Sequence, residues 1–136
     1  MSKESGMGFA VAVDDSGTTA RTISNDITNL SFATPRGVQD ITGVNSSAME
    51  RLLLLADFSV TLNGVFNDAG APSSFDCFKT VPSSSVTRTV TLTVSDQILE
   101  TECLFSDFAL NRGADGSLTW TAPGALNETV VPTWTT

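Results

Sequence analysis

Histidine and tyrosine are both missing from this chain of 136 residues. Histidine is the most frequent general base and metal ligand in proteins, so its absence removes the usual catalytic triads. A serine nucleophile would need a lysine base, but Lys3 lies in a polar terminal segment and Lys79 ends a predicted surface helix. No G-x-G-x-x-G or Walker pattern is present to cradle a phosphate. We therefore expect a protein that is not an enzyme, has no catalytic residues and needs no cofactor.

Cysteine is scarce as well, and Cys77 and Cys103 do not have the spacing of a metal or redox motif. We expect two free, buried thiols in a reducing cytoplasm, with a structural disulfide as the alternative. The acidic turn Asp14–Asp15, and Asp107 with Asp115, could bind a cation. In so acidic a chain we expect them to be solvated instead, and predict no metal site.

Long hydrophobic runs are also lacking. The longest one, Leu52–Ala56, is far too short to cross a bilayer. The first residues are not followed by an apolar segment of signal-peptide length. We therefore expect no membrane segment and a protein that folds in the cytoplasm.

Basic residues are few, with seven against fifteen acidic ones and a net charge of −8. Proteins that grip nucleic acid are usually basic, so this chain should repel DNA rather than hold it. Hydrophobic residues make up 40% of the chain, which is enough for one packed core. We predict a single domain over residues 1–136, with a flexible tail over residues 1–6. The low charged fraction, 16%, suits a surface that is covered by other copies of the chain.

The clearest pattern in the chain is a period-2 alternation over residues 57–66, which predicts a half-buried β-strand. Its apolar side consists of Phe58, Val60, Leu62 and Phe66. Its polar side consists of Asp57, Ser59, Thr61 and Asn63. The polar side is small, hydroxylated and acidic, and it carries no basic residue.

Other segments predict about seven strands in all, with one or two short helices. We expect a bulge near Asn29, a helix over Pro72–Lys79 capped by Ser73 or Ser74, and a hairpin turn at 111–116. We also expect one long strand over Ile98–Leu110. A further strand should begin at Ser117 and end at Pro123–Gly124. The predicted fold class is mainly β, an antiparallel β-sandwich or partial barrel with one or two short flanking helices.

The segment 45–56 can be interpreted in two ways. Ser47 and Glu50 have the spacing of a helix capping box, and four leucines follow, which favours a short helix. The leucines would then cover more than one helix face and run straight into the next strand. The alternative is a long extended arm whose leucines lie against a neighbouring subunit.

Glu100 and Glu102 share one face of a predicted strand. They could form a carboxylate dyad, belong to a solvated outer face, or form an acidic surface that faces something anionic. No residue in the sequence supports the dyad, and the third interpretation agrees with the base-free polar side of the strand at 57–66.

Several of these segments, taken in order, resemble the major tail proteins of long-tailed, siphovirus-type bacteriophages. The resemblance is carried by ITGV at 41–44, SAMER at 47–51, DFSVTLNGVF at 57–66, DFALNRGADGSLTW at 107–120 and PTW at 132–134. No one of these runs is diagnostic; their order and spacing are. The resemblance extends from about Phe9 to Trp134.

The resemblance implies a tail tube fold and a structural subunit that self-assembles into hexameric rings. The stacked rings would form a hollow, acidic-lined conduit for DNA ejection into the host. On this basis the candidates for lining the lumen are Asp57, Ser59, Thr61, Asn63, Glu100 and Glu102, although only one of their two strands need face it. The candidates for subunit contacts are Met49, Leu52, Leu53, Leu54 and Leu55, and an ordinary core helix is the competing interpretation of these leucines.

The implied partners are other copies of the chain, a tape measure protein, and tail terminator and tip proteins. DNA would pass through the tube without specific binding. The implied location is the virion tail, with assembly in the host cytoplasm. Two alternatives remain: another phage ring or decoration protein, such as a tail terminator or a capsid decoration protein, or a monomeric β-sandwich binding module. A carbohydrate-binding module would want exposed aromatic residues, for which Trp120 and Trp134 are the candidates.

Overall fold

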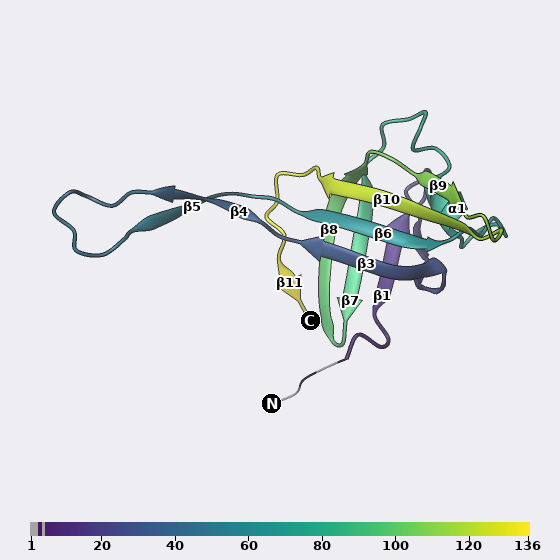
Figure 1. Ribbon diagram of the computed structural model, residues 1–136, viewed down its shortest axis with the longest axis horizontal. Helices are drawn as coiled ribbons and strands as arrows, with labels where there is room; N and C mark the ends of the chain where they lie inside the picture. The colour runs from purple at the N-terminus through teal and green to yellow at the C-terminus, as the bar shows by residue number, and fades with distance from the viewer. Residues whose placement is uncertain (1–2, 4) are drawn as a thin grey trace.

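The computed structural model describes residue 3 and residues 5–136, so the tail expected over residues 1–6 lies partly outside the described residues. The regular secondary structure of the described chain is mainly antiparallel β-sheet, as the composition predicts (Figure 1). The strands are β1 (Ala10–Asp14), β2 (Ala20–Thr22), β3 (Ile27–Ala33), β4 (Arg36–Asp40), β5 (Arg51–Ala56), β6 (Ser59–Val65), β7 (Arg88–Val94), β8 (Gln97–Phe105), β9 (Ala109–Arg112), β10 (Leu118–Leu126) and β11 (Trp134–Thr135). A 3₁₀ turn (Ser24–Asp26) and the helix α1 (Ser74–Phe78) complete the described elements.

Nine strands belong to one sheet whose main order is β2-β1-β7-β8-β10-β6-β3, with β11 beside β8 and β9 beside β10. The sheet folds over on itself where β8 meets β10, because these strands pair over only three residues. The result is two layers that cross steeply (Figure 1). We call β9, β10, β6 and β3 the front layer, and β2, β1, β7, β8 and β11 the back layer.

The core lies between the two layers. The front layer contributes Val60, Leu62 and Trp120, and the back layer contributes Val90, Leu92 and Leu99, all of them buried. Strand β6 follows the predicted alternation, with Val60 and Leu62 buried, and Phe58 just before it is buried as well. Helix α1 covers one end of this core, where the Phe78 ring lies 4.9 Å from that of Phe105 and 5.4 Å from that of Trp120.

Several local predictions are confirmed. The Ser73 hydroxyl accepts a hydrogen bond from the Asp76 N–H at 3.2 Å and so caps helix α1. The β3–β6 pairing shifts register between Ile27 and Asn29, as the broken alternation there predicts. The turn at 111–116 joins β9 to β10 as an antiparallel hairpin.

Other predictions are wrong for identifiable reasons. The helix favoured by the capping pattern at 45–56 does not form, because the leucine segment is strand β5, paired with β4. The Thr42 hydroxyl accepts a hydrogen bond from the Glu50 N–H at 2.8 Å, so the Glu50 backbone is used across a hairpin rather than inside a helix. The count of about seven strands is also too low, since the described chain has eleven.

Two strand boundaries differ from expectation as well. The predicted strand Ile98–Leu110 divides into β8 and β9, which lie in different layers and are separated by residues 106–108. Strand β10 does not end at Pro123–Gly124 but continues to Leu126. Pro123 is tolerated because it lies between the residues of β10 that pair with β9 and those that pair with β8, where no ladder hydrogen bond is interrupted.

Gly64 in β6 marks the closest approach within the front layer. A methyl group at this position would lie only 2.8 Å from the Trp120 ring and would overlap the Asp26 carbonyl oxygen. Both neighbours are fixed, since Trp120 donates a hydrogen bond from Nε1 to the Val65 carbonyl at 3.0 Å and Asp26 is buried. The fold therefore requires glycine at position 64 for space rather than for an unusual dihedral angle.

We predict that Gly64→Ala lowers the free energy of unfolding by about 2 kcal/mol or more, because rigid overpacking of this kind costs about 1–3 kcal/mol. Urea denaturation monitored by tryptophan fluorescence would measure it. Gly6→Ala is the control, since nothing lies within 4 Å of a methyl group there. Equal unfolding midpoints for the two variants would contradict the prediction.

Candidate functional site

The most unusual surface of the molecule is a hairpin that projects from the front layer into solvent (Figure 1). It consists of β4, β5 and the loop between them, residues 36–56, and we call it the arm. It continues the β3–β6 hairpin, since β3 leads into β4 and β5 leads into β6. Every residue of β4 is exposed, and so is every residue of β5 before Ala56. The arm therefore contributes almost nothing to the core.

The arm is also the most apolar part of the exposed surface. Its exposed hydrophobic residues are Val38, Ile41, Val44, Met49, Leu52, Leu53, Leu54 and Leu55. Leu55 is 91% exposed, which is far more than an isolated surface leucine needs to be. Exposed apolar groups that gather in this way mark a contact surface.

Both faces of the arm are apolar. Val38 lies opposite Leu53, and the next pair, Gln39 and Leu52, projects to the other side because successive strand residues alternate. A register shift between Arg36 and Val38 places two residues of β5, Leu54 and Leu55, opposite the single residue Gly37. A cover on one side alone would leave leucines of the other side in water.

Hydrogen bonds hold the arm in shape without help from the body of the protein. The Arg36 guanidinium donates to the Leu54 carbonyl from Nε at 2.9 Å and from Nη2 at 2.8 Å. At the base, the Asp57 N–H donates to the Pro35 carbonyl at 3.0 Å. Two-stranded hairpins are only marginally stable in water by themselves, and the arm is joined to the body through β3 and β6.

All five predicted subunit-contact residues, Met49 and Leu52 to Leu55, lie on the arm and are exposed. That they contact another subunit stays a prediction. Val38, Ile41 and Val44 were not singled out for such contacts, because their importance depends on the pairing of β4 with β5. The sequence signal for these three residues is that they are apolar and closely spaced in the segment before the leucines.

The outer face of the front layer is mainly polar. Strands β3, β6 and β10 contain no charged residue. The Asn63 side chain donates to Asn29 Oδ1 at 2.7 Å and accepts from the Thr121 hydroxyl at 2.8 Å. Ser59 and Thr61 lie on the same face, and Asp57 is exposed just before β6. Four of the predicted lumen residues are therefore together here.

The other two predicted lumen residues lie on the outer face of the back layer. Glu100 faces Thr91 across the β7–β8 pair and accepts a hydrogen bond from its hydroxyl at 3.4 Å. Glu102 accepts one from the Thr89 hydroxyl. Because the core separates the two layers, the outer faces of β6 and β8 point away from each other. One conduit cannot be lined by both sets.

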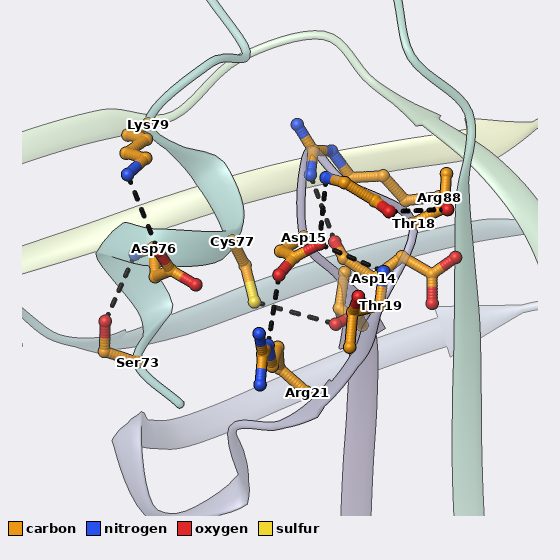
Figure 2. Close-up of polar contacts among 12 residues, drawn as sticks. Asp14, Asp15, Thr18, Thr19, Arg21, Ser73, Asp76, Cys77, Lys79 and Arg88 are labelled. Atoms are coloured by element: carbon orange, nitrogen blue, oxygen red, sulfur yellow. Dashed lines mark hydrogen bonds and ion pairs between the residues drawn. The ribbon is translucent and has the colours of Figure 1, made fainter. Parts of the chain in front are cut away.

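Figure 2 shows a polar cluster that ties helix α1 to the turn between β1 and β2. Arg88 is only 1% exposed, and it donates to the Asp14 carbonyl at 3.0 Å and to the Thr80 hydroxyl at 2.8 Å. Burial lowers the pKa of Arg88 from its usual value. Sequence reasoning overlooked Arg88, although it has the same strand parity as the buried Val90 and Leu92.

The acidic turn beside this cluster has partners within the protein. Asp15 forms a 3.0 Å ion pair with Arg21 and accepts hydrogen bonds from the N–H groups of Thr19 and Gly17. The Thr19 N–H is the main cause of the lowered pKa of Asp15. Among residues 3 and 5–136, no three histidine, cysteine or acidic side chains gather as metal ligands would. The cluster is best described as a structural clamp.

In the part of the chain that the structure describes, no helix is long and apolar enough to cross a membrane.

Comparison with solved structures finds this fold in chains of gene transfer agent particles and of the anti-feeding prophage baseplate. A chain from the virion of a native gene transfer agent particle superposes with a TM-score of 0.77 and 15% identity, over 96% of this chain and 99% of that chain. A chain from the tail of an empty gene transfer agent particle with C6 symmetry gives 0.74 and 16%, over 98% and 100%. A chain from the six-fold symmetrised baseplate of the anti-feeding prophage gives 0.66 and 14%, over 99% and 97%.

No protein-family model matches this sequence, and no curated protein is similar to it. The structural likeness covers nearly the whole chain in each case, so the predicted mainly β tail tube fold is confirmed. At these identities the likeness establishes the fold, and function has to be argued from the surfaces described above.

We predict that the two thiols make stability fall at high pH. Burial raises the pKa of Cys77 to about 12 and that of Cys103 to about 11, from 9.0. At a pH between the ordinary thiol pKa and these raised values, the unfolded chain binds fewer thiol protons than the native one. The free energy of unfolding should therefore fall as pH rises from about 9 toward 12. The double variant Cys77→Ala, Cys103→Ala should lose this part of the pH dependence, measured by urea unfolding. Parallel curves for variant and native protein would contradict the prediction.

Proposed function

We propose that this chain is the structural subunit of a bacteriophage-type tail tube. In this proposal it self-assembles into hexameric rings that stack into a hollow conduit for DNA ejection into the host. The observation that carries the proposal is the arm, which is apolar on both faces and is carried by a domain with the fold of tail-assembly chains. The C6 symmetry of the gene transfer agent tail supports six copies per ring.

The arm makes the contacts between subunits. Moving one leucine side chain from water into an apolar interface is worth about 1.5–3 kcal/mol, and each arm carries four adjacent leucines. Because both faces of the arm need cover, it inserts between two surfaces, one on an adjacent subunit and one on a further subunit or ring. A head-to-tail contact of this kind closes into a ring when the rotation permits.

The outer face of the front layer lines the conduit. Its two lateral strands, β3 and β9, are free to pair with neighbouring subunits, so this layer can continue around a ring. The back layer instead ends in short strands, β2 with three residues and β11 with two. The wall is then made of Ser59, Thr61, Asn63 and similar side chains, and Glu100 and Glu102 face outward.

DNA passes along this wall without specific binding. The electrostatic affinity of proteins for phosphates comes from lysine and arginine, and the strands β3, β6 and β10 carry neither. Six copies at −8 each give a ring a charge of −48, which repels DNA over short distances. The proposed partners are a tape measure protein inside the tube and terminator and tip proteins at its ends. The proposed location is the virion tail, after assembly in the host cytoplasm, and no enzymatic role is involved.

A monomeric carbohydrate-binding module fits the surface less well. Such a module would need exposed aromatic rings, but Trp120 is buried in the core. Trp134, 46% exposed, is the one exposed aromatic residue among those that the structure describes. A terminator or decoration protein shares the expectation of ring contacts, but it would stop at one ring and would not polymerise.

We predict that Leu53→Asp and Leu52→Asp, one on each face of the arm, abolish tube formation and leave the monomer folded. Neither side chain packs in the core, so the free energy of unfolding should change by less than about 0.5 kcal/mol. Negative-stain electron microscopy and sedimentation over a concentration series would measure assembly. Ala69→Asp, in an exposed loop, is the matched control. Normal tubes from both arm variants would refute the role of the arm.

We also predict which face lines the tube. Thr61→Cys in the front layer and Thr91→Cys in the back layer should both react with a small biotin-maleimide after assembly. The native thiols are buried, so they should add no labelling of their own. Streptavidin-gold is too large to enter the tube, so it should decorate Thr91→Cys tubes along their length and bind Thr61→Cys protein only after disassembly. The reverse pattern would place the acidic back layer at the lumen.

A further inference from the structure

The arm forms a two-stranded sheet of its own, which two short connections join to the front layer. Residues 34–35 separate β3 from β4, and residues 57–58 separate β5 from β6. The two connections lie at the same level of the hairpin, because paired strands flank them on both sides. The backbone ladder of the front layer is therefore interrupted where the arm begins.

The bonding at this interruption is that of a hinge. The Asp57 N–H donates to the Pro35 carbonyl at 3.0 Å, but proline has no N–H with which to continue the ladder. The Phe58 N–H donates to the Asp57 carboxylate at 2.7 Å, and the Phe58 carbonyl accepts from the Leu126 N–H in β10 at 2.9 Å. Phe58 is thus fixed to the body, while the chain before it belongs to the arm. A hairpin attached in this way can move as one piece about a few connecting residues.

The chain between β10 and β11, residues 127–133, lies near the base of the arm (Figure 1). We call it the C-terminal segment. It is held at both ends, since the Asn127 N–H donates to the Glu102 carbonyl at 2.9 Å and Trp134 pairs with Leu99 of β8. The C-terminal segment is therefore a wall fixed to the body, beside an arm that is hinged.

An apolar groove of about 340 Å³ lies between the arm and this wall. Leu55 and Ala56 line it from the arm, and Leu126, Val130 and Val131 line it from the other side. Leu55 is 91% exposed, and the two valines are 64% and 56% exposed. Exposed aliphatic side chains thus face one another across an open groove, so closing it would remove apolar surface of both walls from water.

We propose that the arm of the free subunit swings about this hinge and closes on the C-terminal segment, which buries Leu55 against Val130 and Val131. The structure shows the open position. Closure covers one side of the arm before any other copy of the chain is present. Because Leu55 then cannot contact another subunit, closure also holds back self-assembly, and this second step rests on the proposed function.

Thiol labelling of the free subunit tests the closure. In the open position Leu55 is more exposed than Leu53, 91% against 56%. At a concentration where sedimentation shows monomers, Leu55→Cys should nevertheless react with a maleimide about tenfold or more slowly than Leu53→Cys, because a group reacts only in the fraction of molecules that expose it. The native thiols are buried and should add no labelling. Equal or faster labelling of Leu55→Cys would overturn the closure.

A second substitution separates closure from the effect of a nearby charge. Glu128 lines the same groove and could slow the reaction by disfavouring the thiolate. Leu55→Cys, Val130→Ser keeps this carboxylate but weakens the apolar wall, so labelling should become several-fold faster. Leu55→Cys, Leu104→Ser is the matched control, since Leu104 is exposed on the back layer and should leave the rate unchanged. Equal rates in the two double variants would overturn the inference.

A disulfide lock tests the effect on assembly. Leu55→Cys, Val130→Cys should form a disulfide within the monomer and then give no tubes until it is reduced, whereas the native protein should assemble with or without reductant. A pair of cysteines that does not join would contradict the closure, and tubes formed by the locked protein would overturn its effect on assembly. A native protein that forms no tubes under any condition would overturn the proposed function, and the labelling rates would still decide whether the arm closes.

Discussion

The alternation of strand β6 is the constraint on which the rest of the structure depends. Its inward residues Val60 and Leu62, with Phe58 just before the strand, form the centre of the core, and its outward residues form the polar face of the front layer. It pairs with β3 on one side and β10 on the other, so it fixes the register of the whole layer. A slip of one residue would bury Thr61 and Asn63 and expose the core. Gly64 disfavours such a slip further, because only glycine fits beneath Trp120 at that position.

The sequence predicts those parts of the fold that depend on neighbours along the chain. The alternation of β6, the Ser73 cap and the hairpin at 111–116 are local patterns, and all are present. The leucines of β5 were ambiguous because a capping box and an apolar run are equally local signals for a helix. Pairing with β4 decided the outcome, and beyond the paired strands the Thr42 hydroxyl accepts a hydrogen bond from the Glu50 N–H, eight residues away. Pro123 was misread for a similar reason, since its tolerance depends on which strands flank it.

The candidate site shows the same division. Period-2 spacing correctly groups Ser59 with Thr61, and Glu100 with Glu102, on single strand faces. It cannot reveal that the two groups lie on opposite sides of the molecule, because that depends on the fold between β8 and β10. The positions of β3 and β9 at the edges of the front layer likewise depend on the strand order, which no local pattern reveals.

The monomer carries two hazards at once, an apolar arm and two open sheet edges, and its charges limit both. Asp40 and Arg51 lie opposite each other where the arm's strands meet the tip loop, and Glu50 adjoins them. Charges that flank an apolar strand disfavour its pairing with arbitrary chains, because any such pairing must desolvate them. Arg112 has the corresponding position at the end of β9. A partner that matches these charges can cover the leucines, whereas an unrelated strand that covers the leucines leaves the charges unpaired. In the proposed assembly, the same few residues would favour contact with other copies of the chain and limit pairing with unrelated chains.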